Sequence, residues 1–326
     1  MTSTSHQVLQ LLTSGEYVSG EIIGNKLGIS RMAVSKAIKR LKENDVPVTS
    51  VSGRGYRLQR NYQLLDRQRM EKLLDQQGLH GCELHVLESV SSTSDYLLDL
   101  EQKSGVNVSV CLTEEQAQGR GRRKRSWVAT PYRNITMSIA CKFENGMADL
   151  SGLGVVAGIS IIEVLHTFGL DEEIGLKWPN DIVWQDRKLG GLLIDVKGEH
   201  DGPCRAVLGF GLNLSLSSSD SDAIDQPFTT LEEIHGEPID RNALIVELIV
   251  GLAGMLQFYP SKGISHWHEA WQFHDRLYQR PVTVIRGDES IIGTALGINK
   301  QGGLMVSQEN GEAMHFYSGE VSLRIR

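Results

Sequence analysis

The chain has 326 residues, 40% of them hydrophobic and 22% charged, which is an ordinary globular composition and excludes a fibrous or disordered protein. At ~150 residues per domain, this length predicts two or three domains. The first residues lack the basic and apolar regions of a secretory signal, and no uncharged apolar run approaches the ~18 residues of a membrane helix. The four cysteines are widely spaced, which excludes a disulfide scaffold and the common zinc motifs. We therefore expect a cytoplasmic protein with free thiols, no protein-held metal and no membrane partner.

Charge is distributed unevenly along the chain. The formal net charge is -7, but residues 1–60 carry +5 and the remaining residues carry -12. Such an asymmetry indicates one end that faces nucleic acid on an otherwise acidic protein.

The basic end has the pattern of a helix-turn-helix. Apolar residues at 8–12 predict a short amphipathic helix. Ser19 is placed to cap a second helix and Ser30 a third, with a tight turn at Gly28 between them. This order of two short helices, a glycine turn and a polar-faced helix is typical of DNA-binding domains, in which the last helix enters the major groove.

A basic hairpin follows the third helix. Strands at 48–51 and 56–58, joined by a turn at 52–55, predict a wing. The alternative is a solvated basic face on a small protein-interaction domain, but motif order, caps, turn and charge all favour DNA binding. The residues that we expect to contact DNA are Ser30, Arg31, Ser35, Lys36, Lys39 and Arg54.

The middle of the chain begins after a polar linker at residues 61–68. A strand at 84–88 leads to the hydroxyl run at 91–94, which precedes a short apolar helix. Free N–H groups at that helix start could bind a polar or anionic ligand, although a plain helix cap explains the hydroxyls as well.

A second strand, at 106–112, runs into a basic loop. In residues 119–127 two glycines are interleaved with five cations, which repel one another and cannot be buried unpaired. Because Arg matches phosphate oxygens with two donors and glycine allows close approach, we expect a mobile loop that orders on a phosphate-bearing ligand. A nucleic-acid patch is the alternative, and neither P-loop nor dinucleotide-binding fingerprints are present.

Further strands are predicted at 135–143 and 207–216, and a helix at 148–168. Between them lies a turn at Pro179-Asn180, flanked by Lys177 and Asp181, and then Lys188 before two glycines. A lysine beside glycines can reach a ligand closely, because the glycines have no side chains in the way. A single such lysine is, however, more often a surface residue.

The C-terminal third starts with helices predicted at 240–258 and 264–279. From Pro281 five short alternating strands follow in under fifty residues. Such spacing predicts a small SH3-like barrel.

Taken together, these motifs resemble the bacterial biotin–protein ligases. The matching segments occur in the family's order, and the winged head makes the resemblance closest to the bifunctional type, in which ligase and biotin operon repressor share one chain. They are STS at 92–94, GRGRRKRSW at 119–127, KWPNDI at 177–182, KLGGLLID at 188–195, GFGLNL at 209–214, RPVTV at 280–284 and SGEVSLR at 318–324.

The resemblance implies an α+β protein with three domains. It implies a winged helix-turn-helix in residues 1–62, a mixed α/β ligase domain similar to class II aminoacyl-tRNA synthetases in 67–272, and an SH3-like barrel in 273–326. It also implies a two-step reaction. Biotin and ATP, with Mg²⁺, give biotinyl-5′-adenylate, and the biotinyl group then passes to a lysine of the biotin carboxyl carrier protein of acetyl-CoA carboxylase. The other partners implied are operator DNA and, with the adenylate bound as corepressor, a second copy of the chain.

Roles for individual residues follow from the same resemblance. Lys188, Arg122 and Asp181 match the catalytic positions, with Lys188 on the biotin carboxylate and α-phosphate and Asp181 beside the acceptor lysine. The biotin-binding positions are Ser92, Thr93, Ser94, Gln116, Arg120, Gly121, Arg122 and Lys188. The nucleotide-binding positions are Arg120, Arg122, Trp127, Asn180 and Asn213.

The chain departs from the family pattern at two positions. Ser94 stands where the family usually has Asn, and Lys124 where Gly is common. Three rival functions remain at this point: a lipoate–protein ligase, an effector-binding regulator without catalysis, and a ligase whose head no longer binds an operator. The basic loop, the KWPND segment and the charged head favour the bifunctional biotin ligase.

Overall fold

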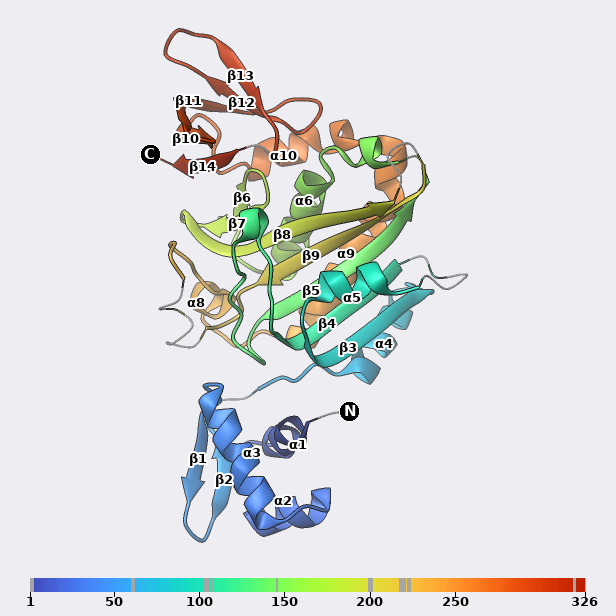
Figure 1. Cartoon of the computed structure of the whole chain (residues 1–326), viewed down its shortest axis with the longest axis vertical. Helices are drawn as coiled ribbons and strands as arrows, with labels where there is room; N and C mark the ends of the chain where they lie inside the picture. The colour runs from blue at the N-terminus through green and yellow to red at the C-terminus, as the bar shows by residue number, and fades with distance from the viewer. Residues whose placement is uncertain are drawn as a thin grey trace.

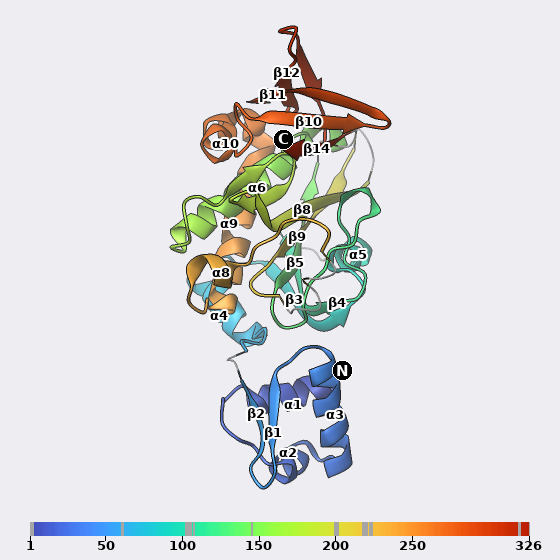
Figure 2. The same ribbon diagram turned by 90° about the vertical axis from the view of Figure 1, so that its left-hand side faces the viewer.

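The computed structural model describes residues 3–59, 62–101, 106, 108–144, 146–198, 202–216, 221, 224–318 and 321–325. Three parts are stacked along the long axis of the molecule, with the N-terminal head at one end and the C-terminal sheet at the other (Figures 1 and 2). This arrangement is the expected order of a head, a mixed α/β body and a small β domain.

The head is a winged helix-turn-helix, as predicted. Ser19 and Ser30 cap their helices through side-chain oxygens, and Gly28 takes the left-handed conformation between them. Leu9, Ile23 and Leu41, from three different helices, lie in one apolar core. Its elements are α1 (Thr4–Leu12), α2 (Gly20–Leu27), α3 (Arg31–Glu43), β1 (Val48–Val51) and β2 (Gly55–Leu58).

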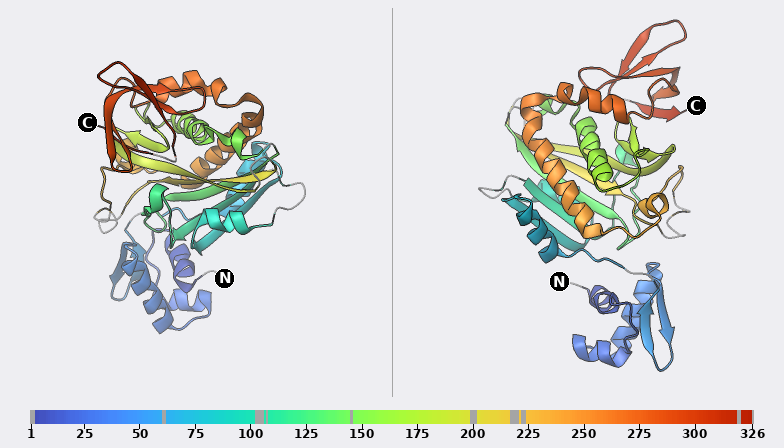
Figure 3. Two further views of the ribbon diagram at one scale, coloured as in Figure 1. Left: turned by 45° about the horizontal axis from the view of Figure 1, so that its top comes forward. Right: turned by 180° about the vertical axis from the view of Figure 1, so that it is seen from behind.

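The body is built on a seven-stranded sheet of order β3-β4-β5-β9-β8-β7-β6, in which only the β3–β4 pair among these strands is parallel. Helices α4, α6 and α9 cover one face and α5 the other (Figure 3). The strands are β3 (Cys82–Val90), β4 (Val108–Gln116), β5 (Ile135–Phe143), β6 (Gly175–Lys177), β7 (Asp181–Trp184), β8 (Arg187–Gly198) and β9 (Cys204–Leu212). The helices are α4 (Arg67–Gln76), α5 (Thr93–Asp99), η1 (Arg122–Lys124), η2 (Met147–Leu150), α6 (Leu153–Thr167), α8 (Leu231–His235), α9 (Arg241–Lys262), η3 (Ile264–Trp267) and α10 (His268–His274).

Helix α9 is long and apolar enough, by length and composition, to cross a membrane. In this structure it lies against α6 and α4, and Leu244, Ile249 and Leu252 are almost completely buried in the main core. Its apolar composition is therefore that of a core helix.

The C-terminal sheet has five antiparallel strands in the order β13-β12-β11-β10-β14. They are β10 (Pro281–Arg286), β11 (Glu289–Ile298), β12 (Leu304–Ser307), β13 (Ala313–Phe316) and β14 (Ser322–Ile325). Their apolar face packs against the body, because Val284, Leu304 and Phe316 belong to the same core cluster as the helices of the body.

Two predicted segments are different in the structure. The helix expected at 264–279 is two short helices that end at His274, because the buried Asp275 is extended and its carboxylate accepts from the N–H of Leu277 at 2.8 Å. In the described part of the linker expected at 61–68, Tyr62 lies in the head's core and α4 already begins at Arg67.

A buried ion pair ties the linker, the sheet and α9 together. Arg241 Nη1 lies 2.6 Å from Glu114 Oε2, and the two side chains are 3% and 1% exposed. Glu114 Oε1 also accepts from the N–H of Leu65 at 2.6 Å, and Arg241 Nη2 donates to the carbonyl of Asn134 at 2.6 Å. Most hydrogen-bonding groups of the pair are therefore satisfied, although Arg241 Nε is buried without a partner among the described residues. Such pairing is the condition under which a buried charge is tolerated.

Replacing Arg241 by Met should destabilise the protein by about 3–5 kcal/mol, because it leaves Glu114 buried and unpaired. Urea unfolding followed by circular dichroism measures this change. The matched control is Arg67→Ala, which removes an exposed pair with Glu71 on α4 and should cost at most ~0.5 kcal/mol. Equal losses in the two variants would contradict the structural role given to Arg241.

Candidate functional site

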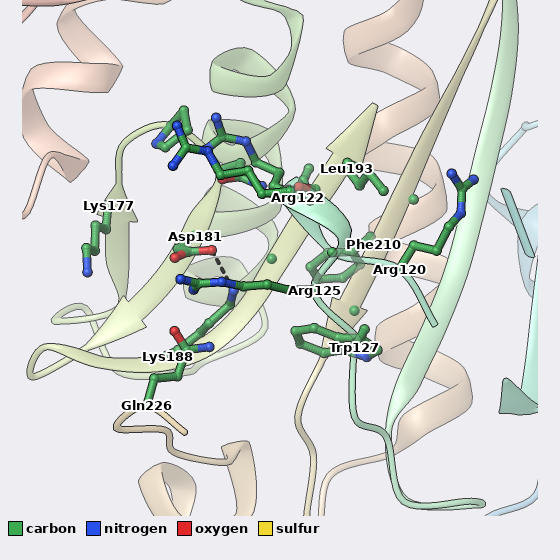
Figure 4. Close-up of a pocket in the computed structure, with 18 of the residues that line it drawn as sticks. Arg120, Arg122, Arg125, Trp127, Lys177, Asp181, Lys188, Leu193, Phe210 and Gln226 are labelled. Atoms are coloured by element: carbon green, nitrogen blue, oxygen red, sulfur yellow. Dashed lines mark hydrogen bonds and ion pairs between the residues drawn. The ribbon is translucent and has the colours of Figure 1, made fainter. Parts of the chain in front are cut away.

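A cleft of about 650 Å³ opens on the sheet between the basic loop, the β6–β7 turn and the C-terminal sheet. Strands β5, β8 and β9 form its floor, and the loop at 225–227 closes one side (Figure 4). Of the predicted site residues, eleven line it: Ser92, Thr93, Ser94, Gln116, Arg120, Gly121, Arg122, Trp127, Asn180, Asp181 and Lys188. Segments far apart in the sequence thus meet in one place.

One end of the cleft is a buried network of hydroxyl groups. Ser92 caps α5, accepting from the N–H of Asp95. Gln116 Oε1 accepts from the N–H of Thr93 at 2.8 Å, and Ser138 Oγ lies 2.7 Å from Thr93 Oγ1 and 3.0 Å from Ser94 Oγ. The helix start therefore has a cap and also offers a set of oriented donors and acceptors to a polar ligand.

The basic loop is closed by backbone hydrogen bonds. The N–H of Gly121 donates to the carbonyl of Arg125 at 2.7 Å, and the N–H of Trp127 donates to the carbonyl of Gly119 at 2.9 Å. The indole of Trp127 lies directly on Gly211, where a Cβ would come within 2.3 Å of the ring. Among the described residues, the buried indole N–H has no hydrogen-bond partner. A flat ring and a free donor on the cleft floor are suited to an aromatic ligand.

Lys188 and Asp181 form an ion pair at the centre of the cleft. Lys188 Nζ lies 2.7 Å from Asp181 Oδ1, with both side chains about one quarter exposed or less, and 5.8 Å from the centre of the Trp127 ring. The N–H of Lys188 donates to the carbonyl of Pro227, and the carbonyl of Lys188 accepts from the N–H of Thr229. These two bonds fix the start of β8. The ammonium is therefore held over the floor, within reach of an anionic ligand.

Arg122 lies across from this pair. Its Nη1 donates to Asn180 Oδ1 at 3.5 Å, which connects the basic loop to the β6–β7 turn. Burial lowers the pKa of Arg122, and the nearby Asp181 carboxylate opposes the shift. Burial likewise lowers the pKa of Lys177, again opposed by Asp181. The cleft thus concentrates positive charge in a partly desolvated place.

Arg120 points away from the ion pair (Figure 4). Its Nη2 lies 2.6 Å from Asp95 Oδ1 and 3.0 Å from Asp195 Oδ2. The side chain therefore fastens the base of the basic loop to α5 and β8. Of the nucleotide-binding residues that we expected, Asn213 is absent from the cleft lining: it is 3% exposed and donates to the carbonyl of Thr229 at 3.3 Å.

Several lining residues were missed by the sequence analysis. Gly209 lines the cleft from β9, where a Cβ would lie 2.7 Å from Ser94 Oγ. Ser138, not singled out from the sequence, bonds to Thr93 and Ser94 but is not itself part of the lining. The only sequence signal was the glycine in β9. Leu323 and Arg324 line the cleft from the C-terminal sheet. Both lie in the SGEVSLR segment that carries the resemblance, but no role in the site was assigned to them from the sequence. Gly319 and Glu320 of the SGEVSLR segment, and the side chain of Lys124, lie outside the described residues.

The described residues contain no cluster of three or more His, Cys, Asp or Glu side chains that could hold a metal ion. Three carboxylates, of Asp181, Asp186 and Asp225, do line the cleft. Mg²⁺ usually takes one or two carboxylates, with phosphates and water completing its shell. The donor set therefore fits a cation that enters with a polyphosphate.

The head presents a second polar surface. The six residues expected to contact DNA, Ser30, Arg31, Ser35, Lys36, Lys39 and Arg54, are all exposed. Arg54, at the tip of the wing, lies over the ring of Tyr17, 4.3 Å from its centre. Met32, next to Arg31, is 82% exposed and was not singled out from the sequence.

Comparison with known proteins places these features in one family. Family models match residues 86–213 (Biotin/lipoate A/B protein ligase family), 4–57 (HTH domain) and 280–324 (Biotin protein ligase C terminal domain). The bifunctional ligase/repressor BirA of Salmonella typhimurium is 38% identical over 99% of this chain and 98% of its own length. BirA of Bacillus subtilis is 25% identical over 94% of each chain.

Among solved structures, the biotin protein ligase from Aquifex aeolicus in complex with biotin and ATP aligns with a TM-score of 0.62 and 25% identity, over 75% of this chain and 99% of that one. With a full-length relative at this identity and three family models in the same order, the chain belongs to the bifunctional ligase/repressor family of biotin–protein ligases.

Proposed function

We propose that this protein is a biotin–protein ligase and a biotin-responsive repressor. It joins biotin to ATP, giving biotinyl-5′-adenylate and pyrophosphate, and transfers the biotinyl group to a lysine of the biotin carboxyl carrier protein. The same adenylate acts as corepressor when the head binds operator DNA. Both activities belong to the cytoplasm. The Lys188–Asp181 ion pair over Trp127, at the centre of a cleft with a hydroxyl-lined end, is the observation that carries the proposal.

Formation of the adenylate brings a carboxylate and a triphosphate together. Cations must neutralise the charge that develops on the α-phosphate, and fixed donors in a partly desolvated site do this at low reorganisation cost. Lys188 takes that position, and Arg122 holds the phosphate from the basic loop. Ser92, Thr93, Ser94 and Gln116 orient the polar ring of biotin. With no covalent enzyme intermediate, the reaction needs no nucleophile from the chain.

The adenine is assigned to the Trp127 side of the cleft. The indole provides a flat apolar surface, and Asn180 joins the basic loop to the opposite turn. Arg120 and Gly121 shape the loop. Asn213 lies beneath the cleft floor and positions the end of β9, because its side-chain amide donates to the carbonyl of Thr229. Asp181 and Asp186 are paired with Lys188 and Arg280, so among the carboxylates that line the cleft Asp225 is the one that would hold a Mg²⁺ ion brought in with ATP, which would supply further neutralisation of the phosphates.

Asp181 has a second role in the transfer step. An acceptor lysine must lose a proton to attack the adenylate, and a carboxylate next to the reaction centre can take it. Asp181 is paired with Lys188 in the free protein. Once Lys188 binds phosphate, the Asp181 carboxylate becomes free to accept a proton from the incoming amine.

The first test mixes the purified protein with biotin and Mg·ATP and looks for biotinyl-adenylate by mass spectrometry. Lys188→Ala should lower the rate of its formation about 100-fold or more, because it removes charge stabilisation from the transition state. The control, Arg286→Ala, removes an exposed cation of the C-terminal sheet and should leave the rate unchanged. Unchanged adenylate formation in Lys188→Ala would refute the role of this lysine. Lipoyl-adenylate from a parallel reaction with lipoate would refute the acyl group chosen here.

Arg122→Ala should release the intermediate instead of abolishing it. The loop would lose its bond to Asn180 and its hold on the phosphate, so adenylate should dissociate about 10-fold faster or more, as expected when a charge-assisted hydrogen bond is lost. Dissociation of labelled adenylate measures this rate. Arg286→Ala, which removes an exposed arginine outside the cleft lining, should change the rate little. Equal rates for the two variants would contradict the role of Arg122.

Operator binding should depend on the head's cations and on the adenylate. Lys36→Ala and Arg54→Ala should each weaken binding to DNA from upstream of biotin-synthesis genes and lower the salt slope by about 1. Gel shifts over a salt series measure both, with Arg286→Ala again as the control. Sedimentation of the same samples should show that adenylate shifts the protein to a dimer whose two-fold axis matches a palindromic site. An unchanged salt slope would contradict the assigned DNA surface.

A further inference from the structure

The chain runs directly from the cleft into the head. It leaves the cleft floor at Trp127, and only five residues later Tyr132 is 5% exposed within the apolar core of the head. The Tyr132 ring lies 5.9 Å from that of His6 on α1. A residue of the body thus completes the core of a different domain, close in sequence to the loop assigned to the adenylate.

The backbone of Tyr132 is in an unfavourable conformation. Its φ is 65°, in the left-handed region, which costs a residue other than glycine about 1–3 kcal/mol unless its surroundings hold it there. Here its ring is held by the head, and its N–H donates to the carbonyl of Glu114 at 3.2 Å. The two anchors act on opposite sides of the same residue.

The next residue, Arg133, bridges three parts of the chain. Its Nη2 donates to the carbonyl of Asp45, just beyond α3, at 2.8 Å. Its Nε donates to the hydroxyl of Tyr62 in the linker at 2.9 Å, and its Nη1 to the carbonyl of Leu216 at 3.3 Å. The helix assigned to the major groove is therefore held, at its C-terminal end, by an arginine of the body.

One more contact joins the head to the body. The N–H of Ser3, which caps α1, donates to Glu88 Oε2 at 2.5 Å, and Glu88 belongs to β3. Both anchoring regions lie on the β3–β4 side of the sheet, near the strand end that carries Gln116 of the cleft. The head's position is thus set by groups next to the cleft as well as by the linker.

We propose that Tyr132 and Arg133 are positioning residues that couple occupancy of the cleft to the position of the head within one protomer. A ligand that draws Arg122 and Trp127 into new contacts pulls on a short segment whose other end is locked in the head. Because such coupling is reciprocal, disturbing the head's end must also loosen the basic loop. The inference rests on the proposed function only in its second test, where the ligand is the adenylate.

The first test needs no ligand. Arg133→Ala removes three hydrogen bonds at the junction but touches no residue that lines the cleft. Hydrogen exchange of the free protein should then be at least ~5-fold faster at the amides of Gly121 and Trp127 than in wild type, the lower limit of typical coupling between sites. Tyr62→Phe, which removes one acceptor, should give a smaller increase in the same direction. Arg69→Ala, which breaks an exposed pair with Asp240 on the body, is the control and should change nothing.

The second test measures DNA affinity below the concentration at which the protein dimerises, on a half-site oligonucleotide. Biotinyl-adenylate should change the affinity of wild type at least ~5-fold and that of Arg133→Ala less than 2-fold. Exchange at Gly121 and Trp127 that stays at the wild-type rate in both junction variants would overturn the inference. Failure of the wild-type protein to bind adenylate, with faster exchange in Arg133→Ala, would overturn the proposed function and leave the junction's coupling standing.

Discussion

The buried pair of Glu114 and Arg241 is the interaction on which the rest of this molecule depends. Glu114 is the last buried residue of β4, two residues before Gln116 in the cleft, and Arg241 begins the longest helix among the described residues. Through Leu65 and Asn134 the pair also holds the linker and the segment that carries Tyr132 and Arg133. Taking two charges out of water costs several kcal/mol per ion, so such a pair survives only where its hydrogen bonds are nearly complete. The same hydrogen bonds connect the linker, β4, α9 and the segment between the basic loop and β5.

The cleft depends on a second constraint, the close approach of backbone to side chain. Trp127 covers Gly211, and Ser94 lies against Gly209, in each case with no space for a Cβ. Gly209 and Gly211 are two residues apart in β9 and therefore face the same side of the sheet. The indole lies on Gly211 and the hydroxyl network lies against Gly209. A methyl group at position 211 would displace the indole, and with it the surface over which Lys188 is held.

Local signals in the sequence were sufficient for the head and for most motifs. Ser19, Gly28 and Ser30 are caps and a turn whose chemistry acts within three or four residues, and they appear in the structure where they were expected. Long-range contacts were not visible. Nothing near Arg241 indicates that its partner lies 127 residues away, and Asn213, expected at the nucleotide, is buried below the floor. The helix expected across 275 stops because the carboxylate of Asp275 bonds to the next turn.

The position of Tyr132 shows why the two activities are hard to separate in this chain. A DNA-binding domain that folded alone would close its core with its own residues, but here the core includes a ring from the body. Removing the body would expose that core, because the Tyr132 ring would no longer cover it. In the proposed coupling, a ligand that reorganises residues 119–127 acts on the head through a covalent path of a few residues, within a single protomer. The proposed regulation by the adenylate then has one part within the protomer and one between protomers, and a mutation at the junction acts on the first.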